Sequence, residues 1–283
     1  MKIAIAGHTG FIGSELKKHF RSKNHEILKI GREDFAKGKE HLSKILSGAD
    51  VLINLAGAPV IKRWTKSYTK ELWDSRILTT KALAEAVMQA SPKPRFFFSH
   101  SGVHIYANTG THTEDSEDFD QKFLATLCQR WEQEALHAKF FCQTYILRVG
   151  MILGTTGGAL PQMARPYKMG AGGKIGDGKQ MVSWMHISDY LEAIDFILKE
   201  APDASVFNFT SPNPVSNAVL SKTLAKALNK PNFFTVPPIA LKMLYGEGAS
   251  LILSGQEVIP RNLQALGYSF RFPQIQEALE DLL

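Results

Sequence analysis

Gly7, Gly10 and Gly13 stand three residues apart in the segment GHTGFIG, directly after a short apolar run at the start of the chain. Glycines at this spacing permit a tight turn, a close approach of backbone N–H groups to a pyrophosphate, and close contact between a strand and the next helix. Because the segment follows a strand pattern and opens a helical one, it predicts dinucleotide binding. We assign these residues to the cofactor: Gly7, Thr9, Gly10, Phe11, Ile12 and Gly13.

The end of the second expected strand indicates which dinucleotide is bound. An acid at this point would hold the ribose 2′-hydroxyl of NAD, but the sequence has Gly31 and Arg32. The planar fork of an arginine suits a 2′-phosphate, so we expect NADP, with NAD less favoured. Glu33 and Asp34 follow at once, and either could take the acidic role, which leaves the NAD alternative open.

The elements that must position these residues alternate along the first half of the chain. Strand patterns at 2–6, 26–30, 51–55, 95–99 and 144–149 are separated by helical patterns, among them 41–46, 69–90 and 119–138. This alternation predicts an α/β fold, a Rossmann-type doubly wound parallel sheet, with residues 1–153 as the nucleotide-binding core.

The second half of the chain differs from the first in composition. The stretch 154–178 is rich in glycine, so we expect mostly loop there, acting as a mobile lid. We expect 154–283 to form a smaller C-terminal lobe on the substrate side, some of whose segments return to the sheet, ending in a module at about 235–283.

Composition excludes several classes of protein. Hydrophobic residues make up 44% and charged residues 21%, which is ordinary for a globular chain, and no apolar run is long enough to span a membrane. The net charge is +6, but Lys and Arg look scattered, so we expect a small-molecule substrate and neither a nucleic-acid nor a membrane partner. Two cysteines without metal-ligand spacing predict no metal site. No apolar signal region precedes the first strand, so we expect a cytoplasmic protein; the oligomeric state stays open.

Longer motifs resemble a known superfamily. The GxxGxxG turn, Asn54-Leu55-Ala56-Gly57 and the segment Trp184-Met185-His186-Ile187-Ser188-Asp189 resemble the extended short-chain dehydrogenase/reductases. Arg63-Trp64, Asp74-Ser75-Arg76, the run LRVGMILGTTGGALPQM and the tail GQEVIPRNLQALGYSFRFPQIQEAL are similar to an atypical branch of NAD(P)-dependent epimerase/dehydratase-like proteins. Some members of that branch are labelled cell-division inhibitors.

The resemblance implies an NADP site that extends beyond the glycine turn. It also implies an oxidoreductase or epimerase-like activity on a small polar molecule. The cofactor residues that it adds lie at strand ends and on the helix expected at 69–90: Gly31, Arg32, Leu55, Ala56, Gly57, Glu71, Arg76, Ser99 and Ile152.

The catalytic pair of that superfamily is missing from the sequence. In the pair, Tyr-x-x-x-Lys, the lysine lowers the pKa of the tyrosine so that its phenol can exchange a proton with the substrate. None of the seven tyrosines has a lysine four residues later, and Cys128 and Glu132 stand at the matching positions. A carboxylate raises the pKa of a neighbouring thiol, so we interpret Cys128 as a small buried residue. The alternative function is therefore a non-catalytic NADP(H)-binding sensor or regulator.

Other candidate catalytic residues follow the strand expected at 95–99. Ser101 stands where the resemblance places a substrate-binding serine, and Tyr106 follows on the same loop. His104 brings an imidazole, which can exchange protons near neutral pH. Ligands of open parallel sheets lie beyond the carboxyl ends of the strands. We therefore expect this loop to meet the substrate-side residues Met151, Trp184 and His186, with basic character from Arg148. His186 is also consistent with a core residue bonded to backbone, and Asp189 with a helix cap.

Overall fold

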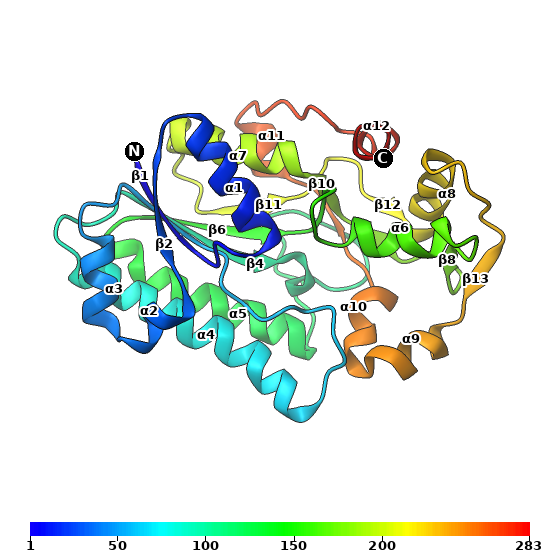
Figure 1. Cartoon of the computed structure of the whole chain (residues 1–283), viewed down its shortest axis with the longest axis horizontal. Helices are drawn as coiled ribbons and strands as arrows, with labels where there is room; N and C mark the ends of the chain where they lie inside the picture. Colours follow the sequence, from blue (N-terminus) through cyan, green and yellow to red (C-terminus); the bar gives the residue numbers. More distant parts are fainter.

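Six parallel strands form the central sheet of the computed structural model, which describes residues 1–283 (Figure 1). The order across the sheet is β2, β1, β3, β4, β6, β11. The chain places β2 on one side of β1 and all later strands on the other side, so the strand order switches between β1 and β3. Ligands of such sheets bind at this switch point, beyond the carboxyl ends of the strands. The expected fold class is confirmed. The bounds are β1 Lys2–Ala6, β2 Glu26–Ile30, β3 Val51–Asn54, β4 Phe96–Gly102, β6 Gln143–Val149 and β11 Val206–Phe209.

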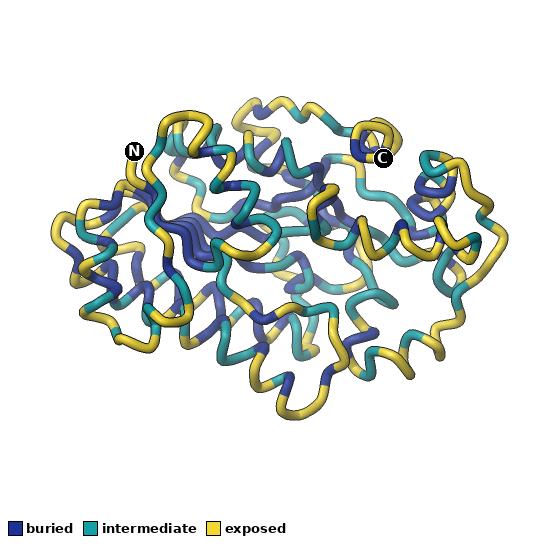
Figure 2. The backbone as a smooth tube through the Cα atoms, viewed as in Figure 1, coloured by how far each residue is buried: buried dark blue, intermediate teal, exposed yellow.

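Helices cover both faces of this sheet, which explains the apolar runs of its central strands. Along β1, Ile3 and Ile5 face one core cluster while Ala4 and Ala6 face the other, as the period of two in a strand requires. The inner strands β1, β3, β4 and β6 are the most buried part of the backbone (Figure 2). One face is covered by α1 Phe11–Ser22 and α7 Ile187–Glu200, and the other by α3 Lys39–Leu46, α4 Lys66–Gln89 and α5 Phe123–Leu136 (Figure 1).

A smaller lobe lies beside the sheet and is built from short elements. Its helices are α6 Leu160–Lys168, α8 Asn217–Ala227, α9 Pro238–Tyr245, α10 Ser250–Leu253, α11 Arg261–Ala265 and α12 Ile275–Leu282, with the 3-10 turn η3 Glu247–Ala249. Its strands are β7 Met151–Leu153, β8 Gly173–Ile175, β9 Met181–Val182, β10 Trp184–His186, β12 Val215–Ser216, β13 Phe234–Val236 and β14 Glu257–Val258. The remaining elements are α2 Arg32–Ala36, η1 Val103–Ile105, β5 Thr111–His112 and η2 His137–Phe140. None of the helices is long and apolar enough to cross a lipid bilayer.

Just over half of the glycine-rich stretch 154–178 is loop or turn, as expected, but α6 and β8 also lie within it. Pro161 stands in the first turn of α6, where its fixed φ favours a helix start. Leu160, Ala164 and Tyr167 recur at helical spacing and are buried against the lobe. The buried apolar stripe therefore stabilises a helix within this stretch in spite of the glycines around it.

The chain is tied to its C-terminal segment at the start of α7. His186 caps this helix, since its Nδ1 accepts a hydrogen bond from the backbone N–H of Ser188 at 3.0 Å. Asp189 does not cap the helix as expected. Its fully buried carboxylate instead accepts hydrogen bonds from the backbone N–H groups of Arg271 (2.7 Å) and Phe272 (3.0 Å). The structure thus confirms His186 as a core residue bonded to backbone and makes Asp189 an anchor for the segment that leads to α12.

We expect Asp189→Ala to lower the free energy of unfolding by at least ~2 kcal/mol, because it leaves two buried N–H groups without an acceptor. Chemical denaturation measures this loss, and limited proteolysis should show earlier cleavage in 268–274. Glu192→Ala, on the exposed side of the same helix, is the matched control. Equal stability of the two variants would contradict the anchoring role.

Candidate functional site

The glycine turn has the shape that a dinucleotide needs. Gly7 has a φ of +82°, and a Cβ on it would lie 2.8 Å from the backbone carbon of Leu55. A Cβ on Gly13 would collide with the carbonyl oxygen of Gly7. A Cβ on Gly10 would meet nothing closer than 3.5 Å, so the backbone there is open to a ligand. The first and third glycines thus serve the fold, while the second leaves room for an approaching phosphate.

Two neighbouring segments pack against this turn. Asn54 shapes the loop after β3, since its Oδ1 accepts from the N–H of Ala56 at 3.1 Å and its Nδ2 donates to Thr80 at 2.7 Å. On the other side, a Cβ on Gly154 or Gly157 would collide with the ring of Phe11. The structure therefore brings Leu55, Ala56 and the segment after Ile152 to the glycine turn, as the resemblance implies.

Arg76 is a buried cation without a carboxylate partner. Its guanidinium donates to the carbonyl oxygens of Leu72 (3.2 Å) and Ala58 (3.0 Å) and lies against Gly57. No acidic side chain lies within ion-pair distance, and burial lowers the pKa of Arg76. An unpaired buried cation favours an anionic ligand, since the charge is otherwise costly. Glu71, placed in the same site from the sequence, is instead exposed on α4.

Ser99 supplies a second polar group without a partner. Its side chain is fully buried in the middle of β4, opposite Asn54 at the carboxyl end of β3, and its Oγ makes no hydrogen bond. Buried hydroxyl groups normally have a partner, so this one marks a place for a ligand atom or a water molecule. Together with the glycine turn, Ser99 and Arg76 fit a polar cofactor at the switch point of the sheet.

The arginine that follows β2 has no partner within the chain. Arg32 is exposed and forms no ion pair or hydrogen bond within the chain. Asp34 is committed to the fold: its carboxylate accepts from the N–H of Gly31 at 2.8 Å and from His41 at 2.8 Å, and the first of these bonds lowers its pKa. Glu33 lies over Gly31, where a Cβ would sit 2.7 Å from its carboxyl carbon. Of the two acids left open by the sequence, Glu33 alone remains placed for a ribose.

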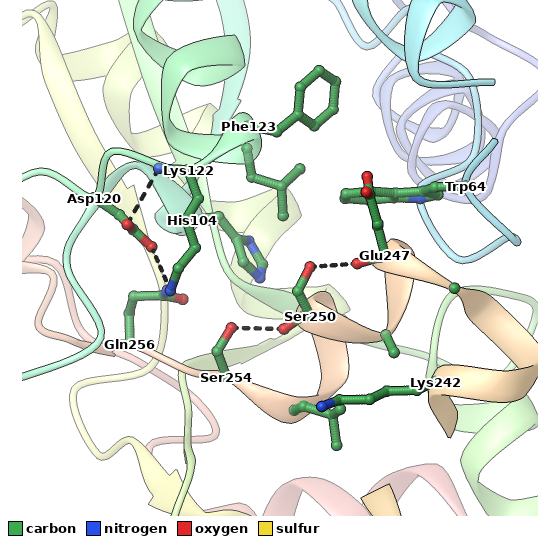
Figure 3. Close-up of a pocket in the computed structure, with 14 residues that line it drawn as sticks. Trp64, His104, Asp120, Lys122, Phe123, Lys242, Glu247, Ser250, Ser254 and Gln256 are labelled. Atoms are coloured by element: carbon green, nitrogen blue, oxygen red, sulfur yellow. Dashed lines mark hydrogen bonds and ion pairs between the residues drawn. The ribbon is translucent and has the colours of Figure 1, made fainter. Parts of the chain in front are cut away.

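A cavity of about 680 Å³ lies between the sheet domain and the C-terminal module (Figure 3). A clasp of two hydrogen bonds joins the segment before α4 to α9: the backbone N–H of Trp64 donates to the carbonyl oxygen of Tyr245 at 3.1 Å, and the side chain of Arg63 donates to that of Met243. Its walls are apolar side chains with charged and polar groups between them: Trp64, His104, Asp120, Lys122, Phe123, Leu124, Lys242, Gly246, Glu247, Ala249, Ser250, Leu253, Ser254 and Gln256.

His104 is the one candidate catalytic residue that lines this cavity. Figure 3 shows its imidazole pointing inward between Phe123 and Ser250. A Cβ on Gly102 would lie 3.5 Å from the Sγ of Cys128 and 4.0 Å from the Nδ1 of His104, so His104 adjoins the position of the missing tyrosine. Burial lowers the pKa of His104 to about 4, although the carbonyl group of Leu251 opposes this. The ring is therefore neutral near pH 7.

Ser101 and Tyr106 lie in a buried network and not in the cavity wall. Glu132 holds Arg148 through two bonds of 2.9 Å and accepts from Ser101 at 2.7 Å. Tyr106 has no exposed surface; its hydroxyl accepts from Arg148 at 2.8 Å and donates to Asn208 at 2.9 Å. Arg148 consequently gives the cavity no basic character, contrary to expectation, because Glu132 neutralises it. Catalytic roles for Ser101 and Tyr106 remain predictions without a route to a substrate in this geometry.

Cys128 and Glu132, which stand at the positions of the missing catalytic pair, are poorly suited to proton exchange. Burial, and then the charge of Glu132, raises the pKa of Cys128 to about 11. Burial alone would lower the pKa of Arg148, but its bonds to Glu132 outweigh this and raise it. The thiol therefore stays protonated and the carboxylate stays bound to its arginine, as a structural interpretation of Cys128 requires.

The substrate-side residues chosen from sequence do not reach the cavity. Trp184 and His186 are buried in the smaller lobe, where the indole N–H of Trp184 donates to the carbonyl oxygen of Asn213 at 3.0 Å. Met151 pairs with Trp184 between β7 and β10. Sequence reasoning missed Phe123 and Lys242, which stand in the wall. Trp64 could have been predicted, since it belongs to the Arg63-Trp64 motif of the resemblance. No sequence motif pointed to the residues of α9 and α10.

We expect Glu132→Gln to lower the free energy of unfolding by about 3–5 kcal/mol, because it leaves the charge of Arg148 buried and uncompensated. Glu117→Gln makes the same chemical change at an exposed site and should leave stability within experimental error. In denaturant titrations, an unchanged midpoint for Glu132→Gln would show that the pair is dispensable.

Comparison with known proteins agrees with this architecture. Residues 3–209 match the NAD dependent epimerase/dehydratase family, and 236–282 match a domain of unknown function, DUF1731. The chain is 34% identical to the epimerase family protein SA0724 of Staphylococcus aureus, over 99% of this chain and 98% of the relative. It is 32% identical to the mouse epimerase family protein SDR39U1 over the full length of both.

Solved structures show the same arrangement. The human epimerase family protein SDR39U1, crystallised with NADPH, has a TM-score of 0.91 and 31% identity, covering 100% of this chain and 99% of that one. The nucleoside-diphosphate sugar epimerase of Corynebacterium glutamicum has a TM-score of 0.80 and 30% identity, covering 100% of this chain and 58% of that one. On its sequence, its sheet and its C-terminal module, the chain belongs to the NAD-dependent epimerase/dehydratase family.

Proposed function

We propose that this protein is an NADP(H)-dependent oxidoreductase or epimerase-like enzyme that acts on a small molecule held in the 680 Å³ cavity. The observation that carries the proposal is the open glycine turn at the switch point, together with a cavity lined by His104, which follows β4. The human relative crystallised with NADPH supports the choice of cofactor. When bound, the nicotinamide supplies or accepts the hydride.

The chain's own residues bind and orient the cofactor. The backbone around Gly10 and the N-terminus of α1 face the pyrophosphate, because free N–H groups and the helix dipole favour negative charge there. Arg32, free at the end of β2, binds the 2′-phosphate, and Arg76 offers a buried positive charge beside Gly57.

His104 exchanges the proton with the substrate in this proposal. Its imidazole is neutral at pH 7, so it can accept the proton of a substrate hydroxyl during oxidation. In the reverse direction it must first be protonated, and with a pKa of about 4 that form is scarce at neutral pH. The protonation state of His104 therefore favours oxidation of an alcohol near pH 7 and reduction of a carbonyl group at lower pH.

One observation favours the alternative of an NADP(H)-binding sensor or regulator without turnover. Glu132 is fully engaged by Arg148 and Ser101, and Cys128 stays protonated, so neither replaces the missing catalytic pair. Incubation with NADPH and a panel of small aldehydes and ketones separates the two functions. Oxidation of NADPH supports the enzyme, and binding without oxidation across the panel supports the sensor.

We expect NADPH to bind more tightly than NADH, and Arg32→Ala to remove most of the difference. A charge-assisted bond to phosphate contributes about 1.5–3 kcal/mol, so calorimetry should show a loss of roughly 10- to 150-fold for NADPH. The NADH affinity should change little.

Two control variants separate this role from general damage to the site. Gly10→Ala fits the fold without a clash and should weaken both cofactors alike. Glu33→Gln should leave NADPH binding intact. Equal affinities of the unmodified chain for NADPH and NADH, or a loss of NADH binding in Glu33→Gln, would instead assign the site to NAD.

We expect His104→Asn to reduce turnover at least ~100-fold while the NADPH affinity stays the same, because it removes the proton-exchanging group. In the unmodified chain, carbonyl reduction should rise about tenfold per unit as the pH falls from 8 to 5, since the protonated fraction grows in that proportion above a pKa of about 4. Persistence of this slope in His104→Asn would assign the proton to another group.

A further inference from the structure

Positive charge gathers on one part of the smaller lobe. Residues 160–180 and 217–245 contain eight cations and a single acid, Asp177, an excess of seven against +6 for the whole chain. None of the eight forms an ion pair, and all but Lys174 are exposed. The sequence alone suggested scattered charges, but the fold collects them: Arg165, Lys168, Lys174, Lys179, Lys222, Lys226, Lys230 and Lys242.

The two segments are neighbours in space. Strand β13 pairs with β8 in parallel, with Phe234 opposite Gly173. At the far end of β8, Gly176 lies against the ring of Pro238, the first residue of α9. Helix α8 packs on β8, and these elements together occupy one end of the molecule (Figure 1).

The same segments also carry exposed apolar side chains. Helix α9 has the sequence PIALKMLY and no buried residue, although a helix that is apolar on all sides is normally buried in a core or a membrane. Ile239 and Met243, one turn apart, are 65% and 71% exposed, and Phe233 before it is 88% exposed. We call the eight cations and these apolar residues the basic-apolar face: Met169, Phe233, Phe234, Ile239, Met243 and Leu244.

We propose that the basic-apolar face binds to the surface of an anionic lipid membrane. Apolar side chains of α9 and of the segment before β13 enter the interface, while lysines around them contact lipid phosphates and carboxylates. Lysine suits this role because its long stem lies along apolar surface while its charge stays in water. The sequence predicted no membrane partner for want of a spanning segment, and binding at the surface needs none.

The composition of the face argues against other partners. Protein interfaces are poor in Lys, whereas this face has seven lysines and one arginine. Single-stranded nucleic acids stack on aromatic rings, whereas four of the six apolar residues here are aliphatic or thioether side chains. A second copy of the chain would bring two strongly positive surfaces together.

Flotation with vesicles tests this binding on the full chain. We expect partition onto vesicles of phosphatidylcholine mixed with phosphatidylserine at low ionic strength, little onto phosphatidylcholine alone, and loss of binding as salt is raised. The pair Ile239→Ser and Met243→Ser should reduce partition at least roughly tenfold, because two large apolar side chains no longer enter the interface. Lys226→Glu with Lys230→Glu should reduce it without changing any apolar residue.

Phe140→Ser is the matched control, since Phe140 is 79% exposed on η2, outside the face, and should keep full partition. Unchanged NADPH affinity in each variant verifies that the fold is intact. The proposal is overturned if the chain does not partition onto anionic vesicles at low salt, or if the α9 pair partitions like Phe140→Ser. It is equally overturned if sedimentation shows the face assembling two copies, or if a nucleic acid displaces the chain from the vesicles.

Discussion

The buried pair of Glu132 and Arg148 is the contact on which the rest of the site depends. It joins α5 to β6, and its further bonds reach β4 through Ser101 and, through Tyr106 and Asn208, β11. Asn208 in turn donates to the carbonyl oxygen of Ile259, in the tail that follows the cavity wall. Because a buried charge without its partner is costly, this network fixes the loop after β4 and with it the position of His104.

The same network explains how the family's catalytic positions have been reused. A lysine at position 132 would face the guanidinium of Arg148, and two buried cations so close would repel each other. A carboxylate there turns the position into a structural support instead. Under the proposed enzymatic function, proton exchange comes from outside the network, and His104 is a titratable group that both adjoins Cys128 and lines the cavity.

The C-terminal module contributes to two surfaces with different chemistry. Its inner side completes the cavity through the clasp between Trp64 and Tyr245 and through the wall residues of α10. Its outer side carries the uncovered helix α9 with Lys242, next to the lysines of the preceding segments. Lys242 belongs to both sides, since it stands in the cavity wall and on the helix that is exposed.

The sequence by itself determined the sheet and the glycine turn, because both rest on local rules. Alternating strands and helices require a parallel sheet, and the spacing of Gly7, Gly10 and Gly13 specifies a turn whose geometry involves only its neighbours. The helix expected at 69–90 and the strand expected at 144–149 were found within a few residues for the same reason.

Only the tertiary structure decided which side chains meet. Trp184 and Tyr106 looked available for a ligand, but packing buried both, whereas Phe123 and Lys242 come from elements far apart in the chain and share one cavity wall. The partner of Arg148 lies sixteen residues away on another element, and the eight cations gather only when β13 pairs with β8. Spacing along a chain reports local backbone geometry; burial, ion pairing and cavity walls depend on contacts between distant segments, which no local pattern encodes.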